Sequence, residues 1–185
     1  MIVFYAIWKF FLPDWEFSEW GVIPAGYVVG YFLNAISSLI EPLLFKCICG
    51  KPSDKLLNPV PGQKWTGIKK VKFYFAEEAV KALKKDTGDA EATTDKMFGY
   101  AMRMANPNKD SRVPDFNGHY ALTRVIFTTV LIAIVLVEVR FYAIWYSWAI
   151  SLAILLLAWT RFRVWGYYYA REVLNEYLKN KKVNK

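Results

Sequence analysis

The chain contains a single histidine, His119, and Arg112 stands seven positions before it. A histidine can take up and release a proton near neutral pH, and an arginine supplies a permanent positive charge, so the two residue types could act together on a charged substrate. Pro114 and Gly118 lie between them. Because a proline inside a helix removes a hydrogen bond and clashes with the preceding turn, we expect a break that prevents one helix from presenting both residues.

The Arg-x6-His spacing resembles the loose signature of HEPN ribonucleases. This resemblance implies that Arg112 and His119 activate an RNA ribose hydroxyl and support the charge that develops on it. The alternative is a histidine at the membrane boundary, hydrogen-bonded to backbone or to a lipid headgroup. An arginine followed by a histidine at this distance is common by chance, so we prefer the alternative and do not expect an enzyme.

Cys47, Cys49 and His119 are the residues that could ligate zinc. A structural zinc site takes four ligands, and the chain has no further Cys or His to supply the fourth. A Cys-x-Cys pair is also poorly placed for a disulfide within a regular helix. We find no glycine-rich phosphate loop and no serine in the histidine context of a nucleophilic triad. The sequence therefore predicts no metal site and no cofactor.

Three long apolar stretches dominate the chain. Hydrophobic residues make up 55% of its 185 residues and aromatic residues 18%, which is more than a soluble domain of this size usually carries. A helix needs about 20 mostly apolar residues to cross a bilayer. The stretches that approach this length are residues 21–40, residues 122–139 (with Arg124 and Glu138 near the ends) and residues 141–160. The predicted fold class is therefore all-α, a polytopic helical membrane protein with three transmembrane helices.

Residues 1–12 are apolar but short, and they contain Lys9. They lack the basic start and the small-residue cleavage site of a secretory signal, so we expect them to be retained. We expect this segment to lie in the membrane interface, with a fourth span as the alternative.

Charge is unevenly distributed and indicates the topology. Residues 1–45 carry a net charge of −3, residues 46–124 of +6 and residues 161–185 of +5. Because basic loops stay in the cytoplasm, both basic regions are predicted to be cytoplasmic, with the N-terminal region outside. The first span then runs inward, the second outward, and the third returns after a tight turn near residues 138–141.

The first span carries a stripe of small and polar residues at intervals of four, which places them on one helix face. Small residues let helices approach closely in lipid, and polar side chains can bond across the contact. This face is interpreted either as packing among the three spans or as a subunit interface or pore lining. Its members are Gly26, Gly30, Asn34, Ser38 and Glu41, and the third span repeats the pattern weakly with Ser147 and Ser151.

The cytoplasmic portion is predicted to contain two short helices after a juxtamembrane loop rich in Gly and Pro. Helical spacing begins at Val71 and ends before Gly88, and a second helix fits residues 90–105, with Asp89 as its N-cap. Two such helices are too small for a core of their own. The support predicted for them is residues 165–179, which would continue the third span as a helix.

Two basic clusters lie in this portion, and we expect them to contact lipid headgroups or a cytosolic protein partner. RNA would attract the same charges but is not favoured, because headgroups need no specificity. The clusters are Lys69, Lys70 and Lys72, and Lys81, Lys84 and Lys85.

Four segments result from these assignments. They are an N-terminal interfacial segment with the first span (residues 1–45), a basic cytoplasmic loop with two short helices (46–120), a transmembrane hairpin (121–160), and a cytoplasmic C-terminal helix with a basic tail (161–185).

Three strings, KPSDKLL (51–57), DFNGHYALTR (115–124) and GYYYAREVLNEYL (166–178), resemble small prokaryotic multi-span membrane proteins of the antiphage-defence accessory or effector type. The resemblance implies a bacterial inner-membrane protein that oligomerises and perturbs the membrane when a cytosolic sensor signals. The expected function is therefore a homo-oligomeric membrane effector or pore-forming accessory protein. The alternatives are a membrane-tethered HEPN-like ribonuclease and a passive adaptor for a cytosolic partner.

Overall fold

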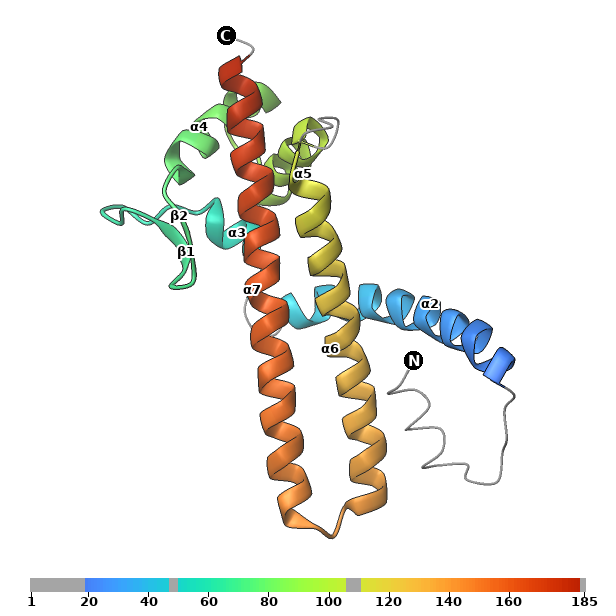
Figure 1. Ribbon diagram of the computed structural model, residues 1–185. Helices are drawn as coiled ribbons and strands as arrows, with labels where there is room; N and C mark the ends of the chain where they lie inside the picture. The colour runs from blue at the N-terminus through green and yellow to red at the C-terminus, as the bar shows by residue number, and fades with distance from the viewer. Residues whose placement is uncertain (1–18, 47–49, 106–110, 184–185) are drawn as a thin grey trace. The chain divides into compact units, whose positions relative to one another are not determined.

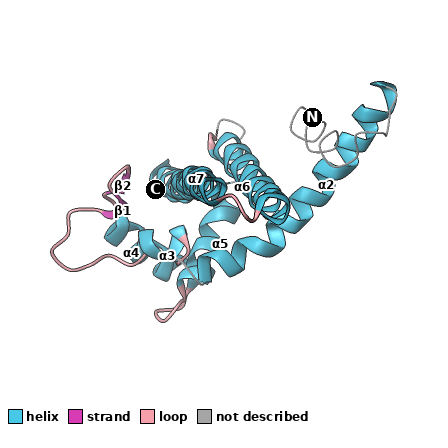
Figure 2. Cartoon of the chain, turned by 90° about the horizontal axis from the view of Figure 1, so that it is seen from below, coloured by secondary structure: helices cyan, strands magenta, loops and turns pink. Residues whose placement is uncertain are grey.

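The computed structural model describes residues 19–46, 50–105 and 111–183. Helices dominate it, and the two short strands in Figure 2 are the only β-structure among these residues. The predicted all-α class is confirmed. The elements are α2 (Glu19–Leu44), α3 (Pro52–Leu56), β1 (Thr66–Ile68), β2 (Val71–Phe73), α4 (Ala76–Thr87), α5 (Thr94–Ala105), α6 (Val113–Phe141) and α7 (Trp145–Val183). Residues 1–12, expected in the interface, lie outside the described part.

Three of the described helices, α2, α6 and α7, are long and apolar enough to cross a membrane. Little of their apolar surface is buried within the chain. Tyr27 is 80% exposed and Leu39 72%, for example. Apolar surface on this scale is not stable against water and indicates that lipid covers it. The chain is therefore a polytopic helical membrane protein.

The second and third spans differ in detail from the sequence expectation. α6 begins at Val113 and runs through both Pro114 and Gly118, so the interruption expected at these two residues is wrong, although Arg112 itself lies just outside the helix. Pro114 lies in the first turn, where its missing N–H would have no helical partner anyway. The tight turn expected at residues 138–141 comes slightly later, between the end of α6 at Phe141 and the start of α7 at Trp145. α7 is one continuous helix, as expected.

The chain divides into two compact units, each built from segments far apart in the sequence. Unit 1 comprises Met1–Pro42 and Arg124–Ala158, and unit 2 comprises Leu43–Thr123 and Trp159–Lys185. By sequence, unit 1 has three Lys and Arg against five Asp and Glu, whereas unit 2 has twenty-one against eleven. The apolar spans thus lie mainly in a weakly acidic unit, and the basic charge is concentrated in the other.

Unit 2 has a hydrophobic core organised around the C-terminal part of α7. In Figure 1 the elements α3, α4 and α5 and the β-hairpin gather around this part of the helix, drawn in red. Leu56 of α3, Phe73 of β2, Leu83 of α4 and Ala101 of α5 are all 2% exposed or less. The α7 residues that complete this core are Tyr167, Ala170, Val173, Leu174, Tyr177 and Leu178. The support predicted for the two short helices is therefore observed.

The start of each short helix of unit 2 was predicted too early. Val71–Phe73, expected to open a helix, forms β2, which pairs antiparallel with β1 and buries Val71 and Phe73 while exposing Lys72. α4 begins at Ala76 and ends at Thr87, and the next residue, Gly88, is its C-cap with a left-handed φ of 66°, which favours glycine. α5 begins at Thr94, and Asp89 accepts a hydrogen bond from Glu91 N at 3.0 Å instead of capping a helix from residue 90.

Gly67 in β1 cannot be replaced without disturbing the hairpin. Its φ is +103°, and an added Cβ would lie 2.5 Å from the backbone oxygen of Val71. We expect Gly67→Ala to lower the free energy of unfolding of unit 2 by about 2 kcal/mol, from backbone strain and the displacement of β2. Thermal unfolding followed by circular dichroism in detergent measures this loss.

Gly62→Ala is the matched control. Gly62 also has a positive φ, +84°, but an added Cβ would meet nothing within 4 Å. This variant should lose only the strain of the left-handed conformation, about 1 kcal/mol. Equal losses in both variants would show that the close approach of Gly67 to Val71 has no energetic consequence.

Candidate functional site

Arg124 links the first and second spanning helices within unit 1. Its guanidinium donates to Glu41 Oε2 at 2.6 Å and to Asn34 Oδ1 at 3.1 Å. The Arg124 and Glu41 side chains are 18% and 24% exposed. Charges with so little access to water are weakly screened, and the bonds go to two different turns of α2. Arg124 therefore fixes the rotation of α2 relative to α6.

The stripe of small and polar residues on α2 has two ends that differ in their contacts. The polar end contacts Arg124 of α6, and the other end is exposed at Gly30. Ser37 Oγ and Ser38 Oγ donate to the backbone oxygen of Asn34 at 2.7 Å and 3.0 Å, so both hydroxyls are bonded within their own helix. Gly26 is partly buried, whereas Gly30 is exposed, and a Cβ added to Gly30 would meet nothing within 4 Å. The polar end of the face thus contacts α6, while none of the residues that the structure describes covers the Gly30 surface.

A buried acid joins α6 to α7 near their connecting turn. Glu138 is 5% exposed, and its Oε1 accepts hydrogen bonds from Ser147 at 3.0 Å and Ser151 at 2.6 Å. Its Oε2 is buried and has no hydrogen-bond partner among the described residues. The two serines at four-residue spacing therefore contact an intramembrane carboxyl, a group that is costly in lipid unless it faces protein.

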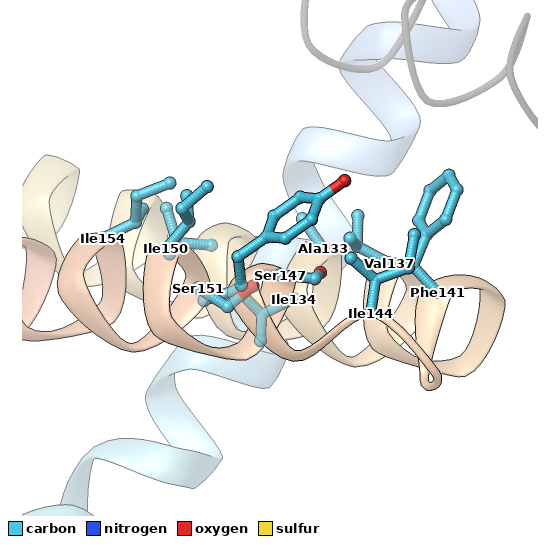
Figure 3. Close-up of a pocket in the computed structure, with 11 residues that line it drawn as sticks. Ala133, Ile134, Val137, Phe141, Ile144, Ser147, Ile150, Ser151 and Ile154 are labelled. Carbon is cyan, nitrogen blue, oxygen red and sulfur yellow. The ribbon is translucent and has the colours of Figure 1, made fainter.

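A groove of about 470 Å³ lies beside this contact, on the same hairpin (Figure 3). Ser147 and Ser151 line it together with apolar side chains, and Tyr146 adds a phenol. No acid, base or thiol lines this groove. Its lining is predominantly apolar, which suits acyl chains. The apolar side chains that line it are Val130, Ala133, Ile134, Val137, Phe141, Ile144, Ile150 and Ile154.

Arg112 lies immediately before α6 and His119 lies within it, both in unit 2, and they contact different aromatic rings. The Arg112 guanidinium carbon is 5.3 Å from the centre of the Phe116 ring. The His119 ring stacks on Trp165 of α7 at 4.5 Å with an angle of 23°. These contacts give each residue a packing role, and the ribonuclease hypothesis stays a prediction.

The two lysine clusters lie on separate elements of unit 2. Lys69 and Lys70 are exposed in the turn between β1 and β2, and Lys72 lies over the Trp65 ring at 5.2 Å. On α4, Lys81 and Lys85 are exposed and Lys84 is partly buried. A basic groove of about 300 Å³ joins α4 to α7, lined by Glu78, Lys81, Ala82, Lys85, Leu178, Lys181 and Lys182.

Asp86 fastens the end of α4 to α7. It accepts hydrogen bonds from Tyr177 Oη and Lys181 Nζ, both at 2.7 Å. Burial alone would raise the pKa of this carboxyl, but the hydrogen bonds from Lys181 and Tyr177 and the charges of Lys181 and Lys85 outweigh it, so the pKa is lowered. The contact therefore stabilises unit 2 above the ordinary carboxyl pKa, and its contribution is lost as the pH falls through the lowered value.

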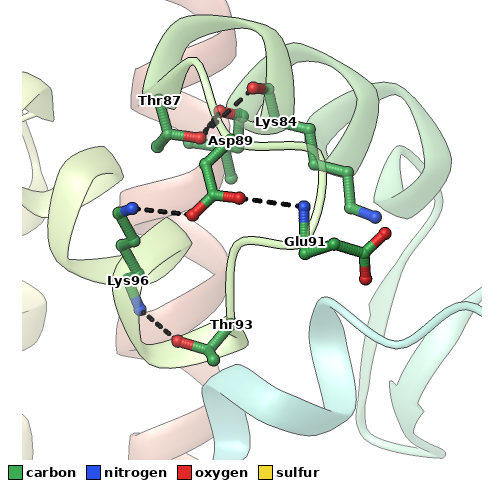
Figure 4. A network of polar contacts seen from close by, with 7 residues as sticks. Lys84, Thr87, Asp89, Glu91, Thr93 and Lys96 are labelled. Atoms are coloured by element: carbon green, nitrogen blue, oxygen red, sulfur yellow. Dashed lines mark hydrogen bonds and ion pairs between the residues drawn. The ribbon is translucent and has the colours of Figure 1, made fainter.

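Asp89 organises the loop between α4 and α5 (Figure 4). It accepts hydrogen bonds from Lys96 Nζ at 2.8 Å and from Glu91 N at 3.0 Å. The bond from Lys96 is the main cause that lowers the pKa of Asp89, followed by the bond from Glu91 N. These exposed contacts define the loop, and Lys96 also lines a shallow groove of about 370 Å³ together with Thr87 of α4 and Tyr100 of α5.

Cys47 and Cys49 lie outside the described residues. Among the residues that the structure describes, no cluster of three or more His, Cys, Asp or Glu side chains could hold a metal ion.

Comparison with known proteins finds no relative of this chain: no protein-family model, no curated protein and no solved structure matches it. The fold and the contacts above therefore carry the functional argument.

Sequence reasoning noted Arg124 and Glu138 only as charges near the ends of a span. Their roles as interhelical contacts were missed. The available signal was their position, because an ionisable residue within a transmembrane stretch usually faces protein and has a partner. The partners themselves could not be identified, because Glu41 lies 83 positions from Arg124 in the sequence.

Proposed function

We propose that the protein is a homo-oligomeric membrane effector, which assembles in the bilayer through α2 and alters membrane permeability as a pore or as an accessory to one. One observation carries this proposal. In the most apolar stretch of α2 only 6% of the residues are buried, against 17% in the corresponding stretches of α6 and α7. The surface of α2 around Gly30 is also exposed.

The way in which helices associate in lipid supports α2 as the helix through which copies of the chain assemble. Because lipid tails are as apolar as leucine, helices associate where small residues allow close packing and polar groups bond across the contact. Arg124 holds α2 at a fixed rotation, so every copy of the chain would present the same Gly30 face. Identical faces that associate with closed symmetry produce a ring or a dimer.

The charge difference between the units supports a cytoplasmic position for unit 2. The surplus of ten positive charges in unit 2 contrasts with a surplus of two negative charges in unit 1. By the positive-inside rule, unit 2 then faces the cytoplasm and the connection between α6 and α7 lies outside. A role in the inner membrane of a prokaryote under phage attack follows from the sequence resemblance alone and belongs to the same proposal.

Gly30→Leu tests the assembly helix. Leucine favours the helix but fills the open surface, so we expect the oligomer to weaken at least about tenfold in its dissociation constant, equal to about 1.4 kcal/mol. Native mass in detergent measures the assembly, and dye release from liposomes containing the purified protein measures permeability. Both should fall together.

Ala35→Leu is the matched control, because residue 35 is exposed and lies about 140° around the helix from residue 30. It should leave mass and dye release unchanged. A wild-type protein that is monomeric, or a Gly30→Leu variant that assembles and releases dye normally, contradicts the proposal. Normal assembly without any dye release would instead favour a passive anchor.

A further inference from the structure

Three arginines of unit 2 lie over three aromatic rings, and these rings contact one another. The residues come from around the beginning of α6 and from the part of α7 that follows its apolar stretch. Each guanidinium has its own ring. Arg112 lies over Phe116 at 5.3 Å, Arg161 over Trp165 at 5.6 Å, and Arg171 over Tyr168 at 5.2 Å. We call these six residues the arginine–aromatic strip.

The three rings form one continuous surface. Phe116 is 5.9 Å from Trp165 and 6.3 Å from Tyr168, and Trp165 is 5.6 Å from Tyr168. His119 extends this surface by stacking on Trp165 at 4.5 Å. A guanidinium stacked on a ring is held in place, while its N–H edge stays available to bind an oxyanion through two hydrogen bonds.

The positive charge of the strip is not neutralised within the described residues. None of the ion pairs formed there involves Arg112, Arg161 or Arg171. Acidic side chains are close in sequence, at Asp115 and Glu172, but they form no salt bridge with the strip. Three fixed guanidinium groups without a carboxylate partner favour an anionic ligand.

The position of the strip along α7 indicates where this anion comes from. Residues 145–160 carry no charge, and Arg161 follows immediately. At about 1.5 Å per residue, Arg161 and Trp165 lie within about 8 Å of the end of the apolar stretch. The headgroup layer on each side of a bilayer is about 5–8 Å thick, so these two residues lie at the depth of lipid phosphates. Tryptophan and arginine are both typical of this depth.

We propose that the arginine–aromatic strip is a binding site for an anionic phospholipid in the leaflet next to unit 2, with the lipid phosphate bound by Arg161 and by the neighbouring arginines. This site is separate from the lysine clusters of the hairpin turn and of α4. It is also independent of the α2 assembly surface, so it can exist whether or not the protein forms a pore.

Retention of lipid by the purified full-length protein tests the proposal. Phosphatidylglycerol and phosphatidylcholine are titrated separately, and bound lipid is counted by native mass spectrometry. The wild-type protein should prefer phosphatidylglycerol. Arg161→Gln combined with Arg171→Gln should weaken this binding roughly 25-fold, since each basic residue near an anionic surface contributes roughly fivefold.

Lys55→Gln combined with Arg103→Gln is the charge-matched control. Both residues are exposed in unit 2 and lie outside the strip. This control should bind phosphatidylglycerol within about twofold of wild type, as judged by the same titration. An equal loss in control and strip variants would overturn the proposal, because it would mean that only overall charge matters. Thermal unfolding of all variants verifies that the fold is kept.

Two competitors test whether the strip binds a soluble anion instead of a lipid. Inorganic phosphate and a single-stranded RNA oligonucleotide are added at increasing concentration to the protein loaded with phosphatidylglycerol. We expect neither to displace the lipid at physiological salt. If the strip variants lose RNA or phosphate binding while retaining phosphatidylglycerol, the site belongs to a soluble ligand and the proposal is wrong.

Discussion

Replacing Arg124 with leucine is expected to lower the free energy of unfolding of the membrane-embedded unit by about 3 kcal/mol, because Glu41 then loses its guanidinium partner in a poorly hydrated position. The value is at the lower end for a buried pair, since both side chains retain some exposure, 18% and 24%. Unfolding in mixed micelles of increasing denaturing-detergent content measures the loss. Arg124→Lys should also be destabilised, because an ammonium cannot reach Glu41 and Asn34 with the geometry of a guanidinium.

A double-mutant cycle separates the ion pair from the other effects of the substitution. Glu41→Leu alone should also be destabilising, since Arg124 is then the unpaired charge. The combined Arg124→Leu and Glu41→Leu variant should lose less than the sum of the two, because no charge is left unpaired. Strictly additive losses would show that Arg124 and Glu41 do not act as a pair.

Leu174→Ala is expected to destabilise unit 2 by about 2–5 kcal/mol, because it creates a cavity in the core that α7 shares with the short helices. Leu174 is fully buried, at 0% exposure. The same substitution at Leu156, which is 53% exposed in the apolar half of the same helix, should cost much less. Lipid replaces the contacts of a leucine there almost without loss. Urea unfolding in detergent, followed by limited proteolysis of unit 2, compares the two variants.

The comparison between these two leucines also tests the environment of α7. If Leu156→Ala were as destabilising as Leu174→Ala, residue 156 would have to be packed inside protein. The helix would then not be exposed to lipid over its first half.

The spans could be predicted from sequence because their signal is local. Uncharged stretches such as residues 141–160 need no partner to be recognised, and continuous helical periodicity extends the last one through Leu178. The buried face of α7 was also predictable, because apolar residues recur there at helical spacing.

The β-hairpin was missed although a signal was present. Val71, Lys72 and Phe73 alternate apolar and charged residues, which is the pattern of a half-buried strand. An alternation of only three residues fits a helix equally well. Because the residues that follow have helical spacing, Val71–Phe73 was interpreted as the start of that helix. Gly67 in β1 has a positive φ that glycine adopts easily and lies close to Val71 of β2, but neither its φ nor this contact can be read from the sequence.

The candidate sites were less predictable than the fold, because they depend on contacts between distant segments. The stripe on α2 was recognised by its spacing, but its division into an end that contacts Arg124 and an open end at Gly30 requires the structure. The arginine–aromatic strip joins residues about 50 positions apart, such as Phe116 and Trp165. The helix break expected at Pro114 was wrong, because it ignored the tolerance of the first helical turn for proline.

Labelling of single cysteines with a membrane-impermeant maleimide tests the central claim most directly, that α2, α6 and α7 cross a bilayer with unit 2 in the cytoplasm. Cys47 and Cys49 are first replaced by serine, and Ala90→Cys, Tyr142→Cys and Leu156→Cys are introduced one at a time. The account predicts labelling of residue 142 in intact cells, of residue 90 only after permeabilisation, and of residue 156 in neither state. Labelling of residue 156, or of residue 90 in intact cells, would contradict it.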